Sequence, residues 1–591
     1  MIAQALAPTR GWSTAVALPG GGWRAMPRPV RAAAVAMSKS LLNPGLADRT
    51  AALLLLAFAV LWAVSATIRN LGLTLQYDMV QSFAYSREFA FGYERHPPLI
   101  NWIVAAYFAV MPARPWAYYL LASLNAALGM YAVWLAAGYV VDLRRRVIAV
   151  ALLGLLPQFT FLASTFNHNT IQLSLWPLVA LSFFASITQR RLVWSVLFGM
   201  MSGLAILGKY YAGLIVVACM LAALVHPDRR AYFESWRPWV AAISCIMVMA
   251  PTLEWLVETG FYSVKRPISD YGGKDVRSLV VLSLRYGAAF VLYLLPMLVA
   301  VAVLLRPSFG TVRRIFRQAL PSTHAVVGCI ALAPVLLTLV MLPLAGIAAH
   351  VPWMYPAFFF APLALIAAPN LFVSRRAVAL AVLGATALAA LGVAISPILM
   401  VAAFRFEREP RVVPNHALAD MATEIWHCRT GRPLAVVGGS LSTTQSISFY
   451  SKDHPSVLPT ASATMPANVI SKRWAEADIL GVCRKAEATC HRTMAYHLPD
   501  AERVDVRAPV TFLGMRRDTE EFVLYLRPNG EAQGAAEQGA VTRAGRPARV
   551  PRCVRPNDPA IDAIMTPSIR VPRDASRSDC EPSCRQRCHS A

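Results

Sequence analysis

The stretch from Tyr77 to Trp102 reads YDMVQSFAYSREFAFGYERHPPLINW and follows directly on the first long apolar segment, so it lies where the chain leaves a membrane. It contains Asp78, Arg95 and His96 in a protein that is otherwise short of charge. Ionisable groups close to a bilayer are costly to desolvate, and they usually have a partner or a functional role. The stretch therefore points to chemistry at a membrane surface.

The composition predicts a membrane protein. Of the 591 residues, 57% are hydrophobic and only 15% are charged, whereas soluble globular proteins average about 45–50% apolar and about 25% charged residues. The formal net charge of +24 would suggest nucleic-acid binding in a soluble protein. Here the basic residues gather in short loops between apolar segments and in the two tails, as expected for cytoplasmic loops. We therefore expect no nucleic-acid partner.

Apolar segments close to the ~20 residues that cross a bilayer recur from residue 51 onward. We expect about eleven transmembrane helices, at 51–69, 117–141, 147–163, 171–187, 193–208, 210–225, 238–257, 280–305, 324–342, 352–368 and 377–404. The shorter segment 98–112 is expected to lie partly in the membrane interface.

The junctions between these segments predict the orientation. Every second junction is rich in arginine, which places those junctions and the N-terminus in the cytoplasm. The opposite junctions carry polar residues that are not simply basic, and they share the outer side. They contain Asp78, Arg95 and His96; Asn167, His168 and Asn169; Lys209, Tyr210 and Tyr211; residues 254–275; and His350 with Trp353.

The domain organisation follows from these patterns. We expect a disordered leader over 1–45, a transmembrane domain over 46–404, a small soluble α/β domain over 405–527 and a disordered basic tail over 528–591. The odd number of spans places the α/β domain outside, in the periplasm. Cys428, Cys483 and Cys490 lie in it, and a disulfide can form among them if that part is exported. The fold class is thus a polytopic α-helical membrane protein with interfacial helices and a small extramembrane α/β domain.

Asp78 is the first candidate for chemistry. Val80, Phe83, Ala84 and Phe91 follow it at near-helical spacing, which predicts an interfacial amphipathic helix with Asp78 in its first turn. A capping role alone would explain a carboxylate at that place. The alternative is a general base that deprotonates an acceptor hydroxyl or amine.

The Pro97-Pro98 pair forms the second candidate element together with Arg95 and His96. The two prolines fix an extended turn, which holds Arg95 and His96 at a defined height over the membrane. Arginine suits bidentate phosphate contact, and histidine can donate a hydrogen bond or a proton. An interfacial anchor before the next helix is the structural alternative.

Four further residues are weaker candidates. Lys209 and Tyr210 lie at the outer end of a span, where the lysine either neutralises a phosphate or extends to the lipid headgroups. Asn169 lies in another outer loop. Glu254 shares a helical face with Glu258, and we expect it inside the bundle or in its mouth, where an ion pair is the structural alternative.

The first outer loop resembles that of glycosyltransferase family 39, which has the GT-C fold, includes the bacterial aminoarabinose transferases and is related to the protein mannosyltransferases. The resemblance rests on Asp78, the aromatic helix after it and the His96-Pro97-Pro98-Leu99 element, and it covers roughly residues 50–370. It implies transfer of a sugar from a polyprenyl-phosphate carrier on the periplasmic face, with inversion at the anomeric carbon. It also implies that Asp78 is the catalytic acidic residue and that His96 binds the carrier phosphate.

Two residues depart from the family pattern. Met79 stands where many members have a glutamate, and Asn169 lies in a loop where relatives often carry a second aspartate. A neutral amide can bind a hydroxyl but cannot act as a base, and this weakens the case for a metal held between two carboxylates. We therefore assign no metal ligand and no certain cofactor, and dependence on a divalent metal stays open.

The leading hypothesis is an inverting membrane glycosyltransferase of the bacterial inner membrane. Asp78 would activate the acceptor, and Arg95, His96, Lys209 and Tyr210 would bind the polyprenyl-phosphate donor among the membrane lipids; the acceptor can be a lipid, a glycan or a protein. The alternatives are a transporter or flippase of lipid-linked sugars and a non-catalytic membrane scaffold. Transporters usually bury polar residues near the bilayer midplane, whereas the polar groups here collect at one surface.

Overall fold

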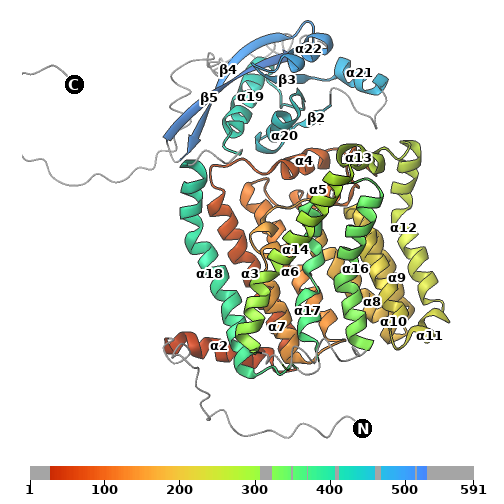
Figure 1. Ribbon diagram of the computed structural model, residues 1–591. Coiled ribbons are helices and arrows are strands. Elements are labelled where there is room, and N and C mark those ends of the chain that lie inside the picture. The colour runs from red at the N-terminus through yellow and green to blue at the C-terminus, as the bar shows by residue number, and fades with distance from the viewer. Residues whose placement is uncertain are drawn as a thin grey trace, which may run out of the picture.

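The computed structural model describes residues 27–528 apart from 274, 307–309, 311–321, 348–349, 369–370, 406–410, 460–466 and 513–514. Within these residues the chain forms a helical bundle with a smaller α/β domain over one end (Figure 1). This is the fold class that the sequence predicts. Most of the predicted leader, residues 1–26, and residues 529–591 of the predicted tail lie outside the described residues.

Six helices of the described chain are long and apolar enough to cross a membrane. They are α3 (Ala47–Arg69), α6 (Pro115–Ala137), α12 (Arg237–Glu258), α14 (Val276–Leu305), α16 (Ser322–Leu344) and α18 (Arg375–Arg405). A seventh span results if α7 (Leu143–Leu153) is counted with the segment Pro157–Ser164, which holds η1 (Pro157–Phe159) and η2 (Leu162–Ser164) and turns away from α7 by 81°. The predicted number of about eleven spans is therefore not confirmed.

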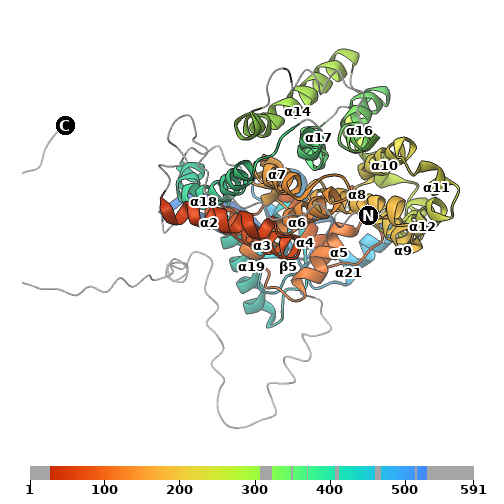
Figure 2. The same cartoon turned by 90° about the horizontal axis from the view of Figure 1, so that it is seen from below.

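Several other predicted spans form shorter helices. They are α8 (Gln172–Gln189), α9 (Leu192–Gly208) and α10 (Gly213–Val225), the last preceded by η3 (Tyr210–Ala212). The segment 98–112 contains α5 (Leu99–Phe108), and α11 (Arg229–Phe233) connects α10 to α12. Large apolar side chains are exposed along α14, including Leu284 and Leu292, as expected for a helix that faces lipid. Figure 2 shows α14 at the edge of the bundle.

The segment predicted as a span over 352–368 is not one long helix. It forms the 3-10 helix η4 (Val351–Phe358) followed by the short helix α17 (Ala361–Ile366). Pro352, Pro356 and Pro362 lie within it, and each proline removes a backbone donor and crowds the preceding turn. Apolar composition alone led to the prediction of a span. The segment instead forms two short helices, each with a proline in its first turn.

The leader predicted as disordered over 1–45 contains helix α2 (Arg28–Leu41). Ala34, Ser38 and Leu41 are buried on one side of this helix. Figure 2 shows α2 lying across α3 and α18 at one end of the bundle. An amphipathic helix in this position can lie in the plane of a membrane interface.

The α/β domain, called the outer domain after its predicted location, is described over residues 411–528 apart from 460–466 and 513–514, and it has its own core. Its five-stranded sheet has the order β2-β1-β3-β5-β4, with β1 parallel to β2 and β3, and β5 antiparallel to β3 and β4. The elements are α19 (Asn415–Thr430), β1 (Val436–Gly439), α20 (Leu441–Tyr450), β2 (Ser456–Leu458), α21 (Ala467–Glu476), β3 (Ile479–Arg484), α22 (Ala488–His497), β4 (Glu502–Phe512) and β5 (Met515–Arg527). Cys483 and Cys490 form a disulfide between β3 and α22.

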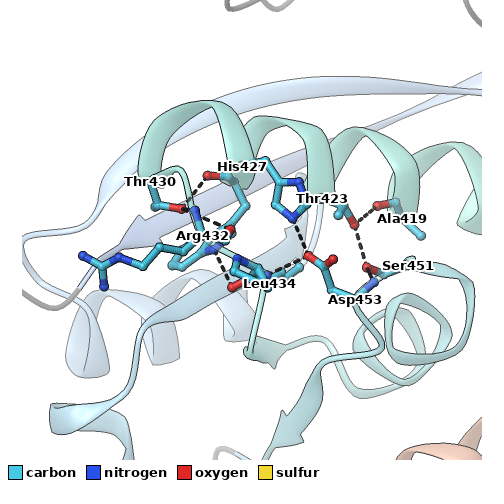
Figure 3. A network of polar contacts seen from close by, with 10 residues as sticks. Ala419, Thr423, His427, Thr430, Arg432, Leu434, Ser451 and Asp453 are labelled. Atoms are coloured by element: carbon cyan, nitrogen blue, oxygen red, sulfur yellow. Dashed lines mark hydrogen bonds and ion pairs between the residues drawn. The ribbon is translucent and has the colours of Figure 1, made fainter. Parts of the chain in front are cut away.

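A polar network ties α19 to the end of α20 and the start of β1 (Figure 3). Asp453 Oδ2 lies 2.5 Å from His427 Nε2 and accepts a 2.7 Å hydrogen bond from the backbone N–H of Leu434. The hydroxyls of Thr423 and Ser451 bond to each other at 2.7 Å. The two hydroxyls pair with each other, and the imidazole pairs with the carboxylate. Neither hydroxyl is therefore bonded to the histidine as a nucleophile would be to its base, and the network stabilises the fold.

We expect Asp453→Ala to destabilise this part of the outer domain. The substitution leaves the buried N–H of Leu434 without its acceptor, which costs about 1–3 kcal/mol. Hydrogen exchange of the α19 and β1 amides in the full-length protein should show a lower opening free energy by about that amount. Substitution of the exposed Asp500 to Ala is the control. Equal exchange in the two variants would contradict the assigned role of Asp453.

Candidate active site

Helix α4 (Tyr77–Ser86) carries Asp78 at its second position. Gln76 occupies the N-cap, and no side chain caps the helix, so the capping role that the sequence left open for Asp78 is not seen. Asp78 Oδ2 instead accepts a 2.9 Å hydrogen bond from Asn167 Nδ2. Burial raises the pKa of Asp78, and the bond from Asn167 and the charge of Lys209 oppose that rise. A carboxylate with a raised pKa is better suited to accept a proton.

The loop at residues 167–170 fixes the direction of the Asn167 amide. Asn167 Oδ1 accepts hydrogen bonds from the backbone N–H groups of Asn169 at 2.9 Å and Thr170 at 3.0 Å. Because two donors occupy the carbonyl oxygen, the NH₂ group must be the part that faces Asp78. The sequence pattern predicts that Asn167 lies on the outer side but indicates no role for it.

His96 stacks on His168, with ring centroids 3.9 Å apart and an angle of 26° between the planes. His168 Nδ1 lies 3.0 Å from the carbonyl oxygen of Gly208; a carbonyl only accepts, so Nδ1 carries the proton. Burial lowers the pKa of His168 to about 3 and the pKa of His96 well below 6.5, and nearby positive charges reinforce the shift at His96. Both rings are therefore neutral at pH 7, and His96 can offer a phosphate a hydrogen bond but no charge.

Lys209 points into the same cluster and not toward the lipid headgroups. Its Nζ donates a 2.5 Å hydrogen bond to Asn169 Oδ1 and lies 4.8 Å from the ring centre of Trp353 and 5.4 Å from that of Tyr211. Burial lowers the pKa of Lys209 to about 7, while the attraction of Asp78 raises it. The sequence suggested no more than a membrane-interface role for Trp353, because nothing local signals that it contacts a lysine 144 positions away.

Helix α13 (Tyr262–Tyr271) forms in a segment that the sequence pattern predicts to be a long loop. Asp270 on this helix pairs with Arg95 at 3.7 Å and with Arg266 at 3.0 Å. Tyr210 shares a 3.0 Å hydrogen bond between its hydroxyl and that of Ser263. The helix thereby connects the His-Pro-Pro turn to the residues that follow α9.

Glu254 does not join this cluster. Its side chain is exposed on α12, and within the described part of the chain it has no hydrogen bond or ion pair. The neighbouring Thr252 donates to the Phe91 carbonyl at 2.8 Å, and the ring of Trp255 packs where a side chain at Gly92 would lie. The expectation that Glu254 lies inside the bundle or its mouth is therefore wrong, because the face of α12 that packs on the outer loop is the one carrying Thr252 and Trp255.

The described residues contain no group of three His, Cys, Asp or Glu side chains arranged to hold a metal ion. The site consists instead of one carboxylate, one partly buried lysine, two neutral imidazoles and two amides. These groups come from three separate junctions, which hold Asp78 and His96, residues 167–169, and Lys209. Asp78, His96, Asn169 and Lys209 are brought together, Arg95 and Tyr210 border the cluster through α13, and Glu254 lies apart.

Fold and site together define a multi-pass membrane protein in which a carboxylate and a lysine are bound to one turn, residues 167–170, at one end of an apolar bundle. Residues 95–255 match the family described as dolichyl-phosphate-mannose-protein mannosyltransferase. The lipopolysaccharide core galacturonosyltransferase RgtA of Rhizobium johnstonii is 26% identical over 285 residues, which are 47% of this chain; the chain spans 56% of that relative. These matches confirm the resemblance to glycosyltransferase family 39 and its GT-C type.

Two solved structures are also similar to this chain. They are ArnT from Cupriavidus metallidurans in the apo state, with a TM-score of 0.48, and the same protein bound to undecaprenyl phosphate, with a TM-score of 0.49. Each comparison covers 80% of this chain and 97% of ArnT at 14% sequence identity.

Proposed function

We propose that this protein is an inverting glycosyltransferase that moves a sugar from a polyprenyl-phosphate carrier to an acceptor hydroxyl or amine. The observation that carries the proposal is that Asp78 and Lys209 are both bound to one turn at the end of an apolar bundle. Asp78 accepts a 2.9 Å hydrogen bond from Asn167, and Lys209 donates a 2.5 Å hydrogen bond to Asn169. A base for the acceptor and a positive charge for a phosphate are the two groups that such a transfer requires.

The proposed reaction is a single displacement. Asp78 takes the proton of the acceptor as its oxygen or nitrogen forms a bond to the anomeric carbon, and the bond from that carbon to the phosphate oxygen breaks. The electron pair leaves with the polyprenyl phosphate, whose new negative charge is stabilised by Lys209 and Arg95 and by a hydrogen bond from neutral His96. Attack opposite the leaving group inverts the anomeric centre.

Two observations support a periplasmic site in a bacterial inner membrane. The outer domain contains the Cys483–Cys490 disulfide, and disulfides persist in oxidising compartments. The arginine-rich helix α11 lies at the end of the bundle opposite the outer domain (Figure 1), as expected for a cytoplasmic end. Polyprenyl chains are membrane-soluble, so the bilayer itself would concentrate the donor beside the site.

The test uses a donor suggested by the name of the relative. Purified protein is incubated with polyprenyl phosphate carrying radiolabelled galacturonic acid, with lipopolysaccharide as the acceptor. We expect labelled lipopolysaccharide and free polyprenyl phosphate in equal amounts, with an inverted anomeric linkage. If the labelled donor is not consumed, and polyprenyl phosphates carrying a neutral hexose, a pentose or an aminopentose are also left intact, the proposal is wrong.

We expect Glu254→Gln to leave the transfer rate within about twofold of the wild-type rate, since a change at an exposed position typically alters the free energy by no more than about 0.5 kcal/mol. This variant also removes one acidic charge from the outer face, so it is a matched control for substitutions of Asp78. A loss of more than about tenfold would place Glu254 in the site and contradict the position of its side chain on α12.

A further inference from the structure

The outer domain contacts α4 just before the helix begins. The hydroxyl of Tyr450, the last residue of α20, accepts a 2.7 Å hydrogen bond from the backbone N–H of Leu75. The backbone carbonyl of Arg411 accepts a 3.0 Å bond from the N–H of Thr74. Both contacts fix the segment that leads directly into Asp78.

The second contact is at the middle of α4. The Phe449 ring meets the Phe83 ring edge-on with centroids 5.0 Å apart, and it also contacts the rings of Phe108 on α5 and Tyr118 on α6. Phe449 is 1% exposed and belongs to the hydrophobic core of the membrane bundle, not to that of its own domain. A side chain from the outer domain thus completes the packing of the bundle beneath α4.

The third contact lies just after α4. Arg473 on α21 forms a two-bond ion pair with Glu88, with Nη1 to Oε2 at 3.1 Å and Nη2 to Oε1 at 2.5 Å. From the bundle side, the Tyr118 hydroxyl donates a 2.9 Å hydrogen bond to the backbone carbonyl of Met79, the residue after Asp78. The helix is therefore held between two domains along its whole length, as its position in Figure 1 shows.

We propose that the outer domain is a positioning part of the active site, in which Phe449, Tyr450 and Arg473 hold α4 so that Asp78 faces Lys209. The inference rests on the proposed function, because it assigns Asp78 the role of base. Catalytic geometry is sensitive to displacements of about 1 Å, which can cost about a hundredfold in rate. Lys209, His96 and Arg95 lie outside α4, so loosening this helix affects the base and leaves the phosphate contacts in place.

The alternative is that the outer domain folds separately and merely docks on the bundle. Its own core, which includes Trp426, Val437 and Leu480, gives it the means to fold without the membrane part. The two accounts differ in what happens to Asp78 when the domain contact is weakened and the domain itself stays folded.

The experiment is a charge exchange across the Arg473–Glu88 pair. Both side chains are 34% exposed, so substitution leaves no buried charge behind. Arg473→Glu and Glu88→Arg each place like charges together, and the double variant restores an opposite pair. Arg432→Glu is the matched control, because Arg432 pairs with Asp478 at 2.8 Å inside the outer domain, with similar exposure and no contact with α4.

In transfer assays with labelled polyprenyl-phosphate galacturonic acid, each single variant should lose at least about tenfold in kcat while the KM for the donor stays within about threefold. The double variant should recover to within about threefold of wild type. The acid limb of the pH–rate profile should move to lower pH in the single variants, because water then reaches Asp78 and lowers its pKa. Loss of folded protein alone would lower the transfer rate equally at every pH and would not move the acid limb of the profile.

Hydrogen exchange supplies a readout that is independent of activity. Amides of α4 should exchange at least about tenfold faster in Arg473→Glu and return toward wild type in the double variant, while those of α6 stay unchanged. Unchanged exchange of α4, or a loss of activity that Arg432→Glu reproduces, would overturn the positioning role. If the wild-type protein consumes none of the sugar donors, the proposed function is wrong. The hydrogen exchange of α4 still tests whether the outer domain holds this helix in place.

Discussion

Asp78→Asn should reduce sugar transfer by about a thousandfold or more, since loss of a positioned general base typically costs about 10²–10⁴ in rate. The amide has the shape of the carboxylate and can still accept the hydrogen bond from Asn167, so the fold of α4 is retained. It cannot accept the proton of the acceptor. The rate of donor consumption by purified protein measures this effect.

Two controls separate catalysis from binding and folding. Glu254→Gln shows what loss of an acidic group on the outer face does by itself. Undecaprenyl phosphate binding by Asp78→Asn, measured at pH 6 where Lys209 retains its proton, should remain within a few-fold of wild type. A variant that keeps a tenth or more of the wild-type rate would mean that Asp78 is not the base.

Lys209→Met should weaken binding of the donor by about a hundredfold, because removal of one partner from a buried charge pair costs about 2–5 kcal/mol. Methionine keeps most of the length of the side chain and its packing against Trp353 and Tyr211, so the loss reports the charge. Titration of purified protein with a phosphonate analogue of the donor, which cannot be consumed, measures the dissociation constant.

The pH dependence of binding gives a sharper test of Lys209. The pKa of Lys209 is about 7 without the donor, and a bound phosphodiester adds a negative charge that raises it, so binding takes up a proton. Affinity should therefore be highest below pH 7 and fall above it, by up to about tenfold per pH unit. His96 and His168 stay neutral through this range because burial lowers the pKa of each.

Lys209→Arg is the matched variant for this titration. Arginine remains charged throughout the accessible pH range, so its affinity for the phosphonate analogue should be nearly independent of pH between 6 and 9. If the wild-type protein shows the same flat profile as Lys209→Arg, then Lys209 is not the group that titrates against the phosphate.

The residues that the sequence identified correctly as neighbours are those with strong local signals. Asp78 is a carboxylate at the end of an apolar span, and His96 precedes two prolines. Both residues can be placed on the same side of the membrane without knowledge of the fold, because the ends of the spans must lie at the membrane surfaces. The approach of Lys209 to this cluster followed from the same argument, since alternating arginine-rich junctions placed it on the same side.

Contacts that depend on rotation or packing could not be predicted in this way. The spacing of Glu254 and Glu258 shows that they share a helical face, but in a nearly all-apolar helix it does not show which face packs inward. The bond from Asn167 to Asp78 joins residues 89 positions apart, and the insertion of Phe449 into the bundle joins two domains. Neither has a signal in the local pattern of residues.

The insertion of Phe449 into the bundle core affects how related transferases can be recombined. A chimaera that exchanges the extramembrane portion alone would pair a foreign aromatic with Phe83, Phe108 and Tyr118 and would break the Arg473–Glu88 match. Grafts that transfer residues 74–118 together with the extramembrane portion keep these complementary surfaces intact. The segment that must be transferred together in a chimaera is therefore set by the packed aromatic side chains. It extends beyond the extramembrane domain into the membrane bundle.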